Sequence, residues 1–478
     1  MSGFTGGAAF ALDPALLEAA ALDLLRAGKI AGALPLLRQV VAVRPDSPEL
    51  LHNFGTALAL TGAVEESLVP LRRALDLRPD AYLTVVRLVQ TLGHIGRWDD
   101  MAALCRDSFA RWPDDPALLR ARAHALAALG DPTALAALEQ AAARLADDAE
   151  AQHDLGSAYG RLNRLDAARA CFDRALALQP GHQGARFNRA YSNLLKGDLA
   201  AAWPDYESRF AMQGAAAPRH TVRPRWTGDD PAGRTLLLHA EQGFGDTLFC
   251  ARYAPLLAAR GARVLLEVPA SLVRLLTPLP GVAGVFPLDT PDLPPFDAQI
   301  PMMSLPGAFA TTLETIPAGI PYLRAPARPA PLPPGRNIGL AWTGNPDNPR
   351  HAARTPPPEA LVPLLDVPGC RFWSVLPEPI PAALQPHLHG PPTPLTDFTD
   401  TAALLAELDL VIAVDTAAAH LAGAMGGPVW LLLPFAPDFR WMLDRNDTPW
   451  YPGMRLFRQP ASGDWDSLIT AVVAALNG

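Results

Sequence analysis

Lysine is almost absent from this chain of 478 residues, which carries it only as Lys29 and Lys196. Nearly every positive charge is therefore an arginine, whose planar guanidinium group suits bidentate contact with a carboxylate or a phosphate. No basic block occurs, and the formal net charge is -8. Nothing in this charge balance indicates a nucleic acid or an anionic membrane surface as a partner.

Cysteines and long apolar runs are also scarce. The four cysteines stand far apart, without metal-ligand spacing or the pattern of a secreted disulfide framework, at Cys105, Cys171, Cys250 and Cys370. The amino terminus lacks the positive charge and compact apolar core of a signal peptide, and no continuous apolar run reaches the roughly 18 residues of a spanning helix. We therefore expect free thiols in a cytoplasmic protein without a membrane span.

Hydrophobic residues, by contrast, make up 49% of the chain, enough to form two or three separate cores. The first core is predicted by an internal repeat. Pro45, Pro79 and Pro113 recur at intervals of 34, and each closes a helix-like run.

The clearest repeat unit covers residues 149–180 and resembles a tetratricopeptide repeat. The residues on the expected spacing are Leu155, Gly156, Tyr159, Ala168, Phe172, Ala175 and Pro180. The small Gly156 and Ala168 would let two antiparallel helices approach closely, while Tyr159 and Phe172 would fill the space between units. We predict five units and a terminal half-unit, which form a helical solenoid over residues 14–210.

A solenoid of this kind offers a concave surface that most often holds a peptide or a partner protein, although pure scaffolding is an open alternative. Its last segment, residues 185–210, is helical by pattern and is predicted to cover the apolar end of the solenoid against the following domain. The sequence leaves open whether the protein forms a homo-oligomer.

The chain changes character after the repeats. Residues 211–233 are rich in proline, glycine and arginine, show no apolar period and are predicted to be a linker. Alternating strand and helix patterns follow over residues 234–325 and, after a proline-rich hinge, again over residues 336–478. The predicted fold class is therefore α plus α/β, a solenoid followed by two Rossmann-like lobes. A cleft between two such lobes suits a two-substrate transfer from which water is excluded.

The second lobe contains a strand-to-helix junction that is suited to bind an anion. The apolar strand predicted over residues 410–414 ends at Asp415 and Thr416, and a helix of small residues begins at Ala417. Ligands of open α/β sheets lie at the carboxyl ends of strands, where free helix N–H groups and the helix dipole favour a phosphate. Thr416 and His420 are therefore candidate contacts to a phosphate or a sugar.

A similar junction occurs in the first lobe. A buried strand predicted over residues 235–240 leads into a turn in which Gly243 and Gly245 permit the close approach of a ligand. Asp246 follows near the start of the next helix, where it could equally be a helix cap. His239, at the end of the strand, could point into the cleft as a second base or could be a core histidine.

Four sequence blocks stand out in the second half of the chain. They are HAEQGFGDTLFCARY at 239–253, GLAWTGNPDNPRHAART at 339–355, LDLVIAVDTAAAHLAGAMGGPVW at 408–430 and RWMLDRNDTPWYPGMRLFRQ at 440–459. With these blocks in this order, residues 149–478 resemble the bacterial tetratricopeptide glycosyltransferases, whose catalytic half is similar to the family 9 heptosyltransferases and, more distantly, to the O-linked N-acetylglucosamine transferases. The resemblance implies a GT-B fold, a nucleotide-diphosphate sugar donor bound in the second lobe, and an inverting transfer that needs no metal and no other cofactor.

The resemblance also implies roles for individual residues. Asp246 would be the base that accepts the proton of the acceptor hydroxyl, and Arg354 would contact the donor phosphates. Further donor contacts would come from Gly243, Gly245, Trp342, Thr343, Gly344 and Asn345, and from Asp415, Thr416, Ala417 and His420. These roles predict a glycosyltransferase that modifies a protein or peptide held by the repeats.

Two other functions remain open. The acceptor could be a saccharide or a lipid-linked glycan, with the repeats only recruiting partners. Alternatively, the protein could be a repeat scaffold whose transferase half is inactive, because no lysine follows Lys196 to meet the donor phosphates and because the loop at residues 345–356 departs from the acidic version common in the family.

Several tempting residues are predicted to be structural. The sequence DWD at residues 464–466 matches a metal-nucleotide signature, but Asp464 is expected to cap the final helix. His387 and His389 are expected to be solvated loop residues without a carboxylate or cysteine ligand nearby. The large aromatic residues expected in the core or between the lobes are Trp373, Trp430 and Trp441.

Overall fold

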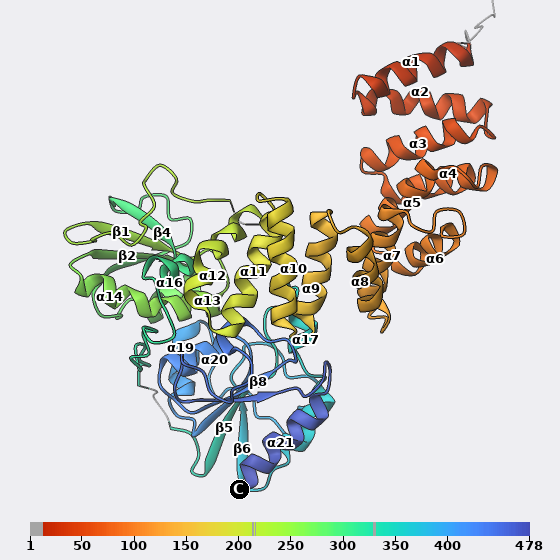
Figure 1. Ribbon diagram of the computed structural model, residues 1–478. Coiled ribbons are helices and arrows are strands. Elements are labelled where there is room, and N and C mark those ends of the chain that lie inside the picture. Colours follow the sequence, from red (N-terminus) through yellow and green to blue (C-terminus); the bar gives the residue numbers. More distant parts are fainter. Residues whose placement is uncertain (1–12, 213–214, 216, 328–330) are drawn as a thin grey trace, which may run out of the picture. The chain divides into compact units, whose positions relative to one another are not determined.

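The computed structural model describes residues 13–212, 215, 217–327 and 331–478 (Figure 1). The chain divides into two compact units. Unit 1 runs to Tyr159 and includes residues 177–180, and unit 2 comprises residues 160–176 and 181–478. Unit 1 is helical, whereas unit 2 combines helices with two parallel sheets.

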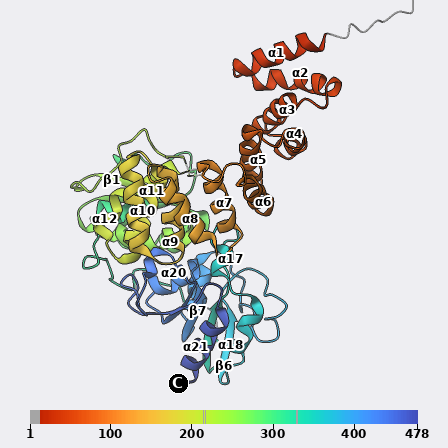
Figure 2. The ribbon, with the colours of Figure 1, turned by 45° about the vertical axis from the view of Figure 1, so that its right-hand side comes forward.

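Unit 1 is a stack of helix pairs (Figure 2). The two helices of each of the first four pairs are joined by a tight turn, and each turn contains a glycine with positive φ, namely Gly28, Gly62, Gly96 and Gly130. These glycines recur at the 34-residue interval that the prolines predict, so the predicted repeat is confirmed. The helices are α1 (Pro14–Arg26), α2 (Ile30–Val43), α3 (Pro48–Leu60), α4 (Val64–Leu77), α5 (Tyr82–His94), α6 (Trp98–Ser108), α7 (Pro116–Ala128), α8 (Ala134–Arg144) and α9 (Ala149–Arg161).

Small residues allow the helices of a pair to approach closely. A Cβ added to Gly55 of α3 would lie 2.6 Å from Cγ of Leu71 in α4. Leu71 and Ala74 are fully buried in the same contact. In this repeat a glycine therefore faces a leucine across the helix pair, which lets the two helices approach closely.

Unit 2 begins with the last repeat helices, which pack on its first sheet. The predicted helical segment forms α11 (Gln183–Lys196) and α12 (Leu199–Tyr206), after α10 (Leu165–Leu178). Trp203 of α12 is buried, and its indole Nε1 donates to the carbonyl oxygen of Thr311 at 2.8 Å. This terminal segment therefore shares one hydrophobic core with the α/β region, as expected for a covering repeat.

The first lobe is a four-stranded parallel sheet in the order β3-β2-β1-β4 (Figure 1). Its central strand is apolar and buried, as the run of leucines predicts. The strands are β1 (Thr235–His239), β2 (Arg263–Val268), β3 (Val282–Pro287) and β4 (Ala298–Pro301), and the helices are α13 (Phe244–Cys250), α14 (Ala254–Ala259), α15 (Ala270–Leu276) and α16 (Leu305–Ala308).

The second lobe is a five-stranded parallel sheet in the order β6-β5-β7-β8-β9. The strands are β5 (Arg336–Ala341), β6 (Cys370–Ser374), β7 (Leu410–Val414), β8 (Val429–Leu433) and β9 (Met454–Arg458). The helices are α17 (His351–Arg354), α18 (Val362–Leu365), α19 (Phe398–Leu405), α20 (Ala417–Ala424) and α21 (Trp465–Asn477). Two parallel sheets with connecting helices confirm the predicted α/β class of this half.

The segment between the repeats and the first sheet packs against the sheet. In the described part of the predicted linker 211–233, the backbone N–H of Trp226 donates to the carbonyl oxygen of Gln299 in β4 at 2.9 Å, and the Trp226 side chain is fully buried. The linker therefore follows the edge of the first lobe at this point. Residues 328–330 of the predicted hinge lie outside the described residues.

Candidate functional site

The second-lobe junction has the predicted geometry. Every residue of β7 is buried, and α20 begins directly after it with Thr416 as its N-cap residue. The carbonyl oxygen of Thr416 accepts the N–H groups of Ala419 at 3.0 Å and His420 at 3.3 Å. The amides ahead of Ala419 belong to the first helical turn, whose N–H groups have no partner within a helix. Thr416 and Ala417 therefore stand at the positive end of the helix dipole, where an anion is favoured.

The first-lobe junction gives Asp246 two roles at once. Its Oδ2 accepts the backbone N–H of Gly243 at 2.9 Å, which is the helix-capping role. Its Oδ1 forms an ion pair with Nη2 of Arg440, which comes from the second lobe. The capping role and a role in the cleft are therefore compatible, because each uses a different carboxylate oxygen.

The two junctions lie against each other. A Cβ added to Gly245 of α13 would lie 2.7 Å from Cδ2 of His420 in α20. The ring of Phe249, also in α13, lies edge-on to the His420 ring with a centroid distance of 6.3 Å. The structure therefore brings the start of α13, which contains Gly245 and Asp246, against His420 of α20, more than 170 positions later in the sequence.

Arg440 joins the two lobes at this point. It begins the fourth sequence block, at residues 440–459, but the sequence assigns it no role. It is buried, at 4% exposure, and its guanidinium group bridges Asp246 of the first lobe and Asp438 of the second. The guanidinium carbon lies 4.5 Å from the ring centroid of Phe249 and 4.6 Å from that of Phe439. Burial alone would lower the pKa of Arg440, but the two carboxylates raise it well above its ordinary value, so Arg440 stays charged.

Arg354 contacts the residue that precedes the N-cap of α20. Its Nη1 donates to the carbonyl oxygen of Asp415 at 3.1 Å. A Cβ added to Gly344 would lie 3.0 Å from Nη2 of Arg354 and 3.2 Å from Oγ1 of Thr416. The predicted donor loop, Arg354 and the start of α20 therefore converge, and Nε of Arg354 is buried without a hydrogen-bond partner among the described residues.

Burial sets the charge of the two titratable groups beside this helix. His420 is buried, its Nδ1 lies 2.9 Å from the hydroxyl oxygen of Tyr451, and its Nε2 lies 3.7 Å from Oδ1 of Asp415. Burial and the charge of Arg440 lower the pKa of His420 well below its ordinary value, so the imidazole is neutral. Burial and the nearby Asp438 raise the pKa of Asp415 to about 6.

The remaining predicted donor residues occupy different environments. Trp342 is buried at the end of β5, at 4% exposure. Asn345 is exposed, and its Oδ1 accepts the N–H of Asp347 at 3.0 Å, which closes a turn. Gly243 is exposed at the start of α13. Trp342 and Asn345 therefore lie in the segment that connects β5 to α17, and their donor contacts stay predictions.

His239 lies in a cavity of the first lobe. Its Nε2 is 2.9 Å from Oε1 of Gln299, and its Nδ1 is buried without a partner among the described residues. Burial lowers the pKa of His239 to about 4, so the ring is neutral. The cavity measures about 620 Å³, and its described lining includes Arg219, Glu241 and Gln242 but not Asp246. The structure therefore does not bring His239 to the predicted base, although Gln242 of the same turn borders this cavity.

Unit 1 has a cavity of its own between successive repeats. It measures about 260 Å³ and is lined by residues of α5, α6, α7 and α9. Its wall is mainly apolar, with polar groups at several positions, and the residues that line it include Val86, Gln90, Trp98, Met101, Ala121, His124 and Asp154. A cavity of this composition suits an apolar side chain flanked by backbone polar groups.

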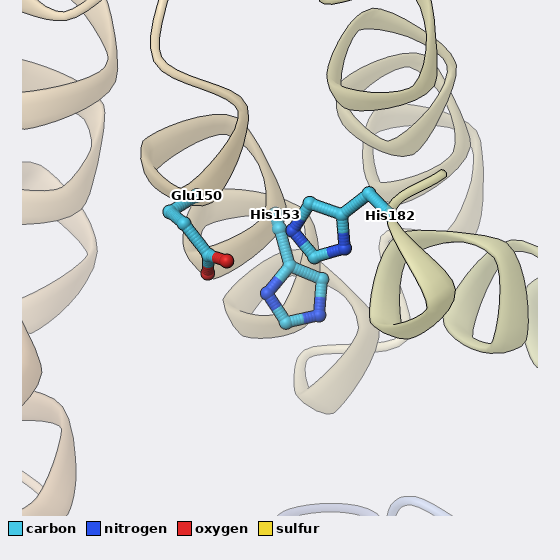
Figure 3. Close-up of side chains that lie close together, drawn as sticks. All are labelled: Glu150, His153 and His182. Atoms are coloured by element: carbon cyan, nitrogen blue, oxygen red, sulfur yellow. The ribbon is translucent and has the colours of Figure 1, made fainter. Parts of the chain in front are cut away.

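The side chains of Glu150, His153 and His182 are shown in Figure 3. Glu150 and His153 stand one turn apart on α9, and Nδ1 of His153 lies 3.5 Å from Oδ1 of Asp154. His182 is the N-cap residue of α11, and its Nδ1 accepts the backbone N–H of Ala185 at 3.1 Å. We assign no metal to these side chains, and a metal-independent reaction stays a prediction.

The structural roles predicted for other residues can be compared with their contacts. Oδ1 of Asp464 accepts the N–H of Ser467 at 3.1 Å, so Asp464 caps α21 as predicted. The sequence predicts no carboxylate near His387, but its Nδ1 lies 2.6 Å from Oδ1 of Asp366, a residue distant in sequence. Trp373 and Trp441 are buried as expected, and Trp441 lies against His420 with ring centroids 5.3 Å apart.

Comparison with known proteins identifies the repeats. Residues 18–82 and 153–219 match the family model of the tetratricopeptide repeat. Protein FlbA of Caulobacter vibrioides is 27% identical over an alignment that covers 91% of this chain and 73% of that protein. This relative spans both the repeats and the α/β region.

Two solved structures are similar to part of the chain. MamA from Desulfovibrio magneticus RS-1 shares 20% identity at a TM-score of 0.34 and covers 35% of this chain and 96% of its own. TTC0263, a TPR protein of Thermus thermophilus, shares 22% identity at a TM-score of 0.31 and covers 38% of this chain and all of its own. Because both TM-scores are low, the assignment of the repeats rests on the family match and on the helices themselves.

In the part of the chain that the structure describes, no helix has the length and apolarity needed to span a bilayer.

Proposed function

We propose that this protein is a glycosyltransferase of the GT-B type, which moves a sugar from a nucleotide-diphosphate donor to a protein or peptide acceptor presented by the repeats. The observation that carries this proposal is the meeting of two strand-to-helix junctions from two parallel sheets. One junction supplies a carboxylate, Asp246, and the other supplies the amino terminus of α20. A base opposite an anion-binding helix is the arrangement that sugar transfer from a diphosphate requires.

In the proposed reaction, Asp246 acts as the general base. Its Oδ1 accepts the proton of the acceptor hydroxyl while the hydroxyl oxygen bonds to the anomeric carbon of the sugar. The bond between that carbon and the phosphate oxygen breaks, and its electron pair leaves with the diphosphate, which gives inversion at the carbon. Because Oδ1 is held by Arg440, the acceptor hydroxyl has to share or replace this contact, whereas Oδ2 remains the cap of α13.

The departing diphosphate gains negative charge, and the second lobe would stabilise it. The first-turn amides of α20, the hydroxyl of Thr416 and the guanidinium of Arg354 converge where Gly344 leaves room. A helix terminus contributes only about 0.3 to 1 kcal/mol when exposed, so several amides and Arg354 would have to act together. No metal or other cofactor is needed for this proposed step.

A scaffold without catalysis is the second candidate function. The ion pair between Asp246 and Arg440 favours it, because the carboxylate already has a partner in the ligand-free protein. Under this alternative the lobes would hold a partner or a ligand without transfer, and the repeats would carry the biological role.

Donor binding and transfer can be measured separately. Thermal-shift titrations with uridine, guanosine and adenosine diphosphate sugars should raise the melting temperature for one donor class, because a ligand that binds the native state stabilises it. Arg354→Ala should weaken that binding by about 10-fold or more, the usual loss for a hydrogen bond to a charged group. Asp246→Asn should keep donor binding and abolish transfer, which mass spectrometry of the acceptor would detect.

Each result has a clear meaning. If the wild-type protein binds no nucleoside diphosphate or nucleotide sugar, the transferase proposal fails. If it binds a donor but Asp246→Asn and the wild type are equally inactive with every acceptor, the scaffold is favoured. A mass increase on a saccharide or lipid-linked glycan instead of a protein would correct the acceptor class.

A further inference from the structure

Arg440 contacts Oδ1 of Asp246, the candidate base. The contacts that position Arg440 therefore also position Asp246. Its Nη1 donates to Oδ1 of Asp438 at 2.8 Å, while its Nη2 contacts Asp246. The two carboxylates come from different lobes and share one guanidinium group. The geometry at Asp246 therefore depends on how firmly Asp438 is held.

Asp438 is held through both of its carboxylate oxygens. Oδ1 accepts the backbone N–H of Arg440 at 3.1 Å together with the Nη1 donor. Oδ2 accepts the hydroxyl of Tyr191 at 3.1 Å. Burial raises the pKa of Asp438, but Arg440 and Arg350 together lower it below its ordinary value, so the group is an ionised acceptor.

Tyr191 belongs to the terminal repeat helix α11 and not to either lobe. Its ring lies edge-on to Phe439 with a centroid distance of 5.9 Å, and the guanidinium carbon of Arg350 lies 4.6 Å from its ring centroid. Nη1 of Arg350 donates to the Tyr191 hydroxyl oxygen. Burial raises the pKa of Tyr191, so the hydroxyl keeps the proton that it donates to Asp438.

We propose that Tyr191 is a positioning residue, which links the terminal repeat to the candidate base through Asp438 and Arg440. The catalytic consequence of this link rests on the proposed function, whereas the link itself does not. Loss of the hydroxyl leaves Oδ2 of Asp438 without its donor, so Asp438 and Arg440 can rearrange and Asp246 loses its fixed orientation. The repeat therefore does more than recruit an acceptor, because one of its side chains sets the geometry of the site.

A double-mutant cycle tests the link without any assay of activity. The melting temperatures of the full-length wild type, Tyr191→Phe, Asp246→Asn and the double variant are compared without ligand. In the described residues no hydrogen bond joins Tyr191 directly to Asp246, so unlinked residues would give additive shifts. We expect a departure from additivity of about 2 °C, typical of residues in one network in a domain of this size. Additive shifts would overturn the proposal.

A matched control uses another buried tyrosine hydroxyl in the same unit. The hydroxyl of Tyr253 lies 2.9 Å from Oγ1 of Thr311 and has no part in this network. The cycle of Tyr253→Phe with Asp246→Asn should be additive. Equal coupling in both cycles would show a general effect of losing a buried hydroxyl and would also overturn the proposal.

Kinetics separate positioning from substrate binding. Tyr191→Phe should lower kcat by about 3- to 10-fold and leave the donor KM unchanged, because the lost contact orients the base and does not touch the donor. A raised donor KM at unchanged kcat would contradict a positioning role. If the wild type transfers no sugar, the proposed function fails, and the double-mutant cycle still decides whether Tyr191 and Asp246 are linked.

Discussion

At the scale of single residues, the site contains an arginine, Arg440, that is paired with two carboxylates. It also contains a carboxyl group, Asp415, whose charged form is disfavoured by burial. Arg440 remains charged because it lies between Asp246 and Asp438. Asp415, by contrast, is mostly buried beside a neutral His420, and burial shifts its titration upward. At Asp415, burial and the like charge of Asp438 outweigh the guanidinium groups of Arg440 and Arg354, so the stability of the second lobe depends on pH.

The first prediction concerns this pH dependence. The pKa of Asp415 is raised from 3.8 to about 6 in the folded protein, so between these pH values the native state binds more protons than the unfolded state. Its contribution to stability is therefore present at low pH and is lost as the pH rises through about 6. Relative to the wild type, Asp415→Asn should gain about 2 to 3 kcal/mol between pH 4 and pH 7, measured by urea unfolding at each pH without ligand.

The control for this prediction is Asp292→Asn, which neutralises an exposed carboxylate of the first lobe. Its difference from the wild type should be nearly the same at both pH values. A raised pKa at Asp415 would be contradicted if Asp292→Asn and Asp415→Asn changed equally between the two pH values. It would also be contradicted if Asp415→Asn lost stability relative to the wild type as the pH rises.

At the scale of elements, the helices and strands follow from local pattern, whereas their contacts do not. The apolar run at 410–414 predicts β7 with the bounds that the structure has, because a strand buried on both faces needs a continuous apolar sequence. Local pattern does not predict the strand β9, because its five residues, Met454–Arg458, include two arginines and no β-branched residue. The role of Arg440 also could not be found by pattern, because its partner Asp246 lies in the other lobe and contacts it only when the lobes pack.

The second prediction concerns the contact between α13 and α20. A methyl group at Gly245 would lie 2.7 Å from Cδ2 of the buried His420, so one of the two helices must move. Gly245→Ala should therefore lower the free energy of unfolding by about 1 to 3 kcal/mol, the usual cost of overpacking, and should weaken donor binding. Chemical unfolding of the full chain and the thermal-shift titration measure the two effects.

Gly160→Ala provides the comparison for Gly245→Ala. Gly160 lies in α9, and a Cβ built there has no atom within 4 Å. Because alanine favours a helix over glycine, this variant should be neutral or more stable by about 0.5 to 1 kcal/mol. Equal destabilisation by both substitutions would show that backbone freedom, and not the contact with His420, explains the effect.

At the scale of the whole molecule, the two units contain different kinds of site. Unit 1 has a mainly apolar cavity between repeats, which suits a segment of a partner. Unit 2 combines the last repeat helices with both sheets, and its candidate site lies where α13 and α20 meet. The proposed function therefore assigns recognition of the acceptor to unit 1 and the reaction to unit 2.

The third prediction tests this division of roles. Ala121 lines the repeat cavity from α7, and the long charged side chain of Ala121→Arg should fill the space between α5 and α7. If the repeats hold the acceptor, Ala121→Arg should raise the KM for a protein acceptor by about 10-fold, since the introduced side chain would occupy the space that an acceptor side chain takes. Donor binding and the slow hydrolysis of the donor by water should stay unchanged, because both depend on unit 2.

The control is Val69→Arg, which adds the same group to a 75% exposed position of α4 and should change neither the acceptor KM nor donor hydrolysis. If Ala121→Arg leaves acceptor use unchanged, or if it reduces donor hydrolysis as strongly as transfer, the repeat cavity is not the acceptor site.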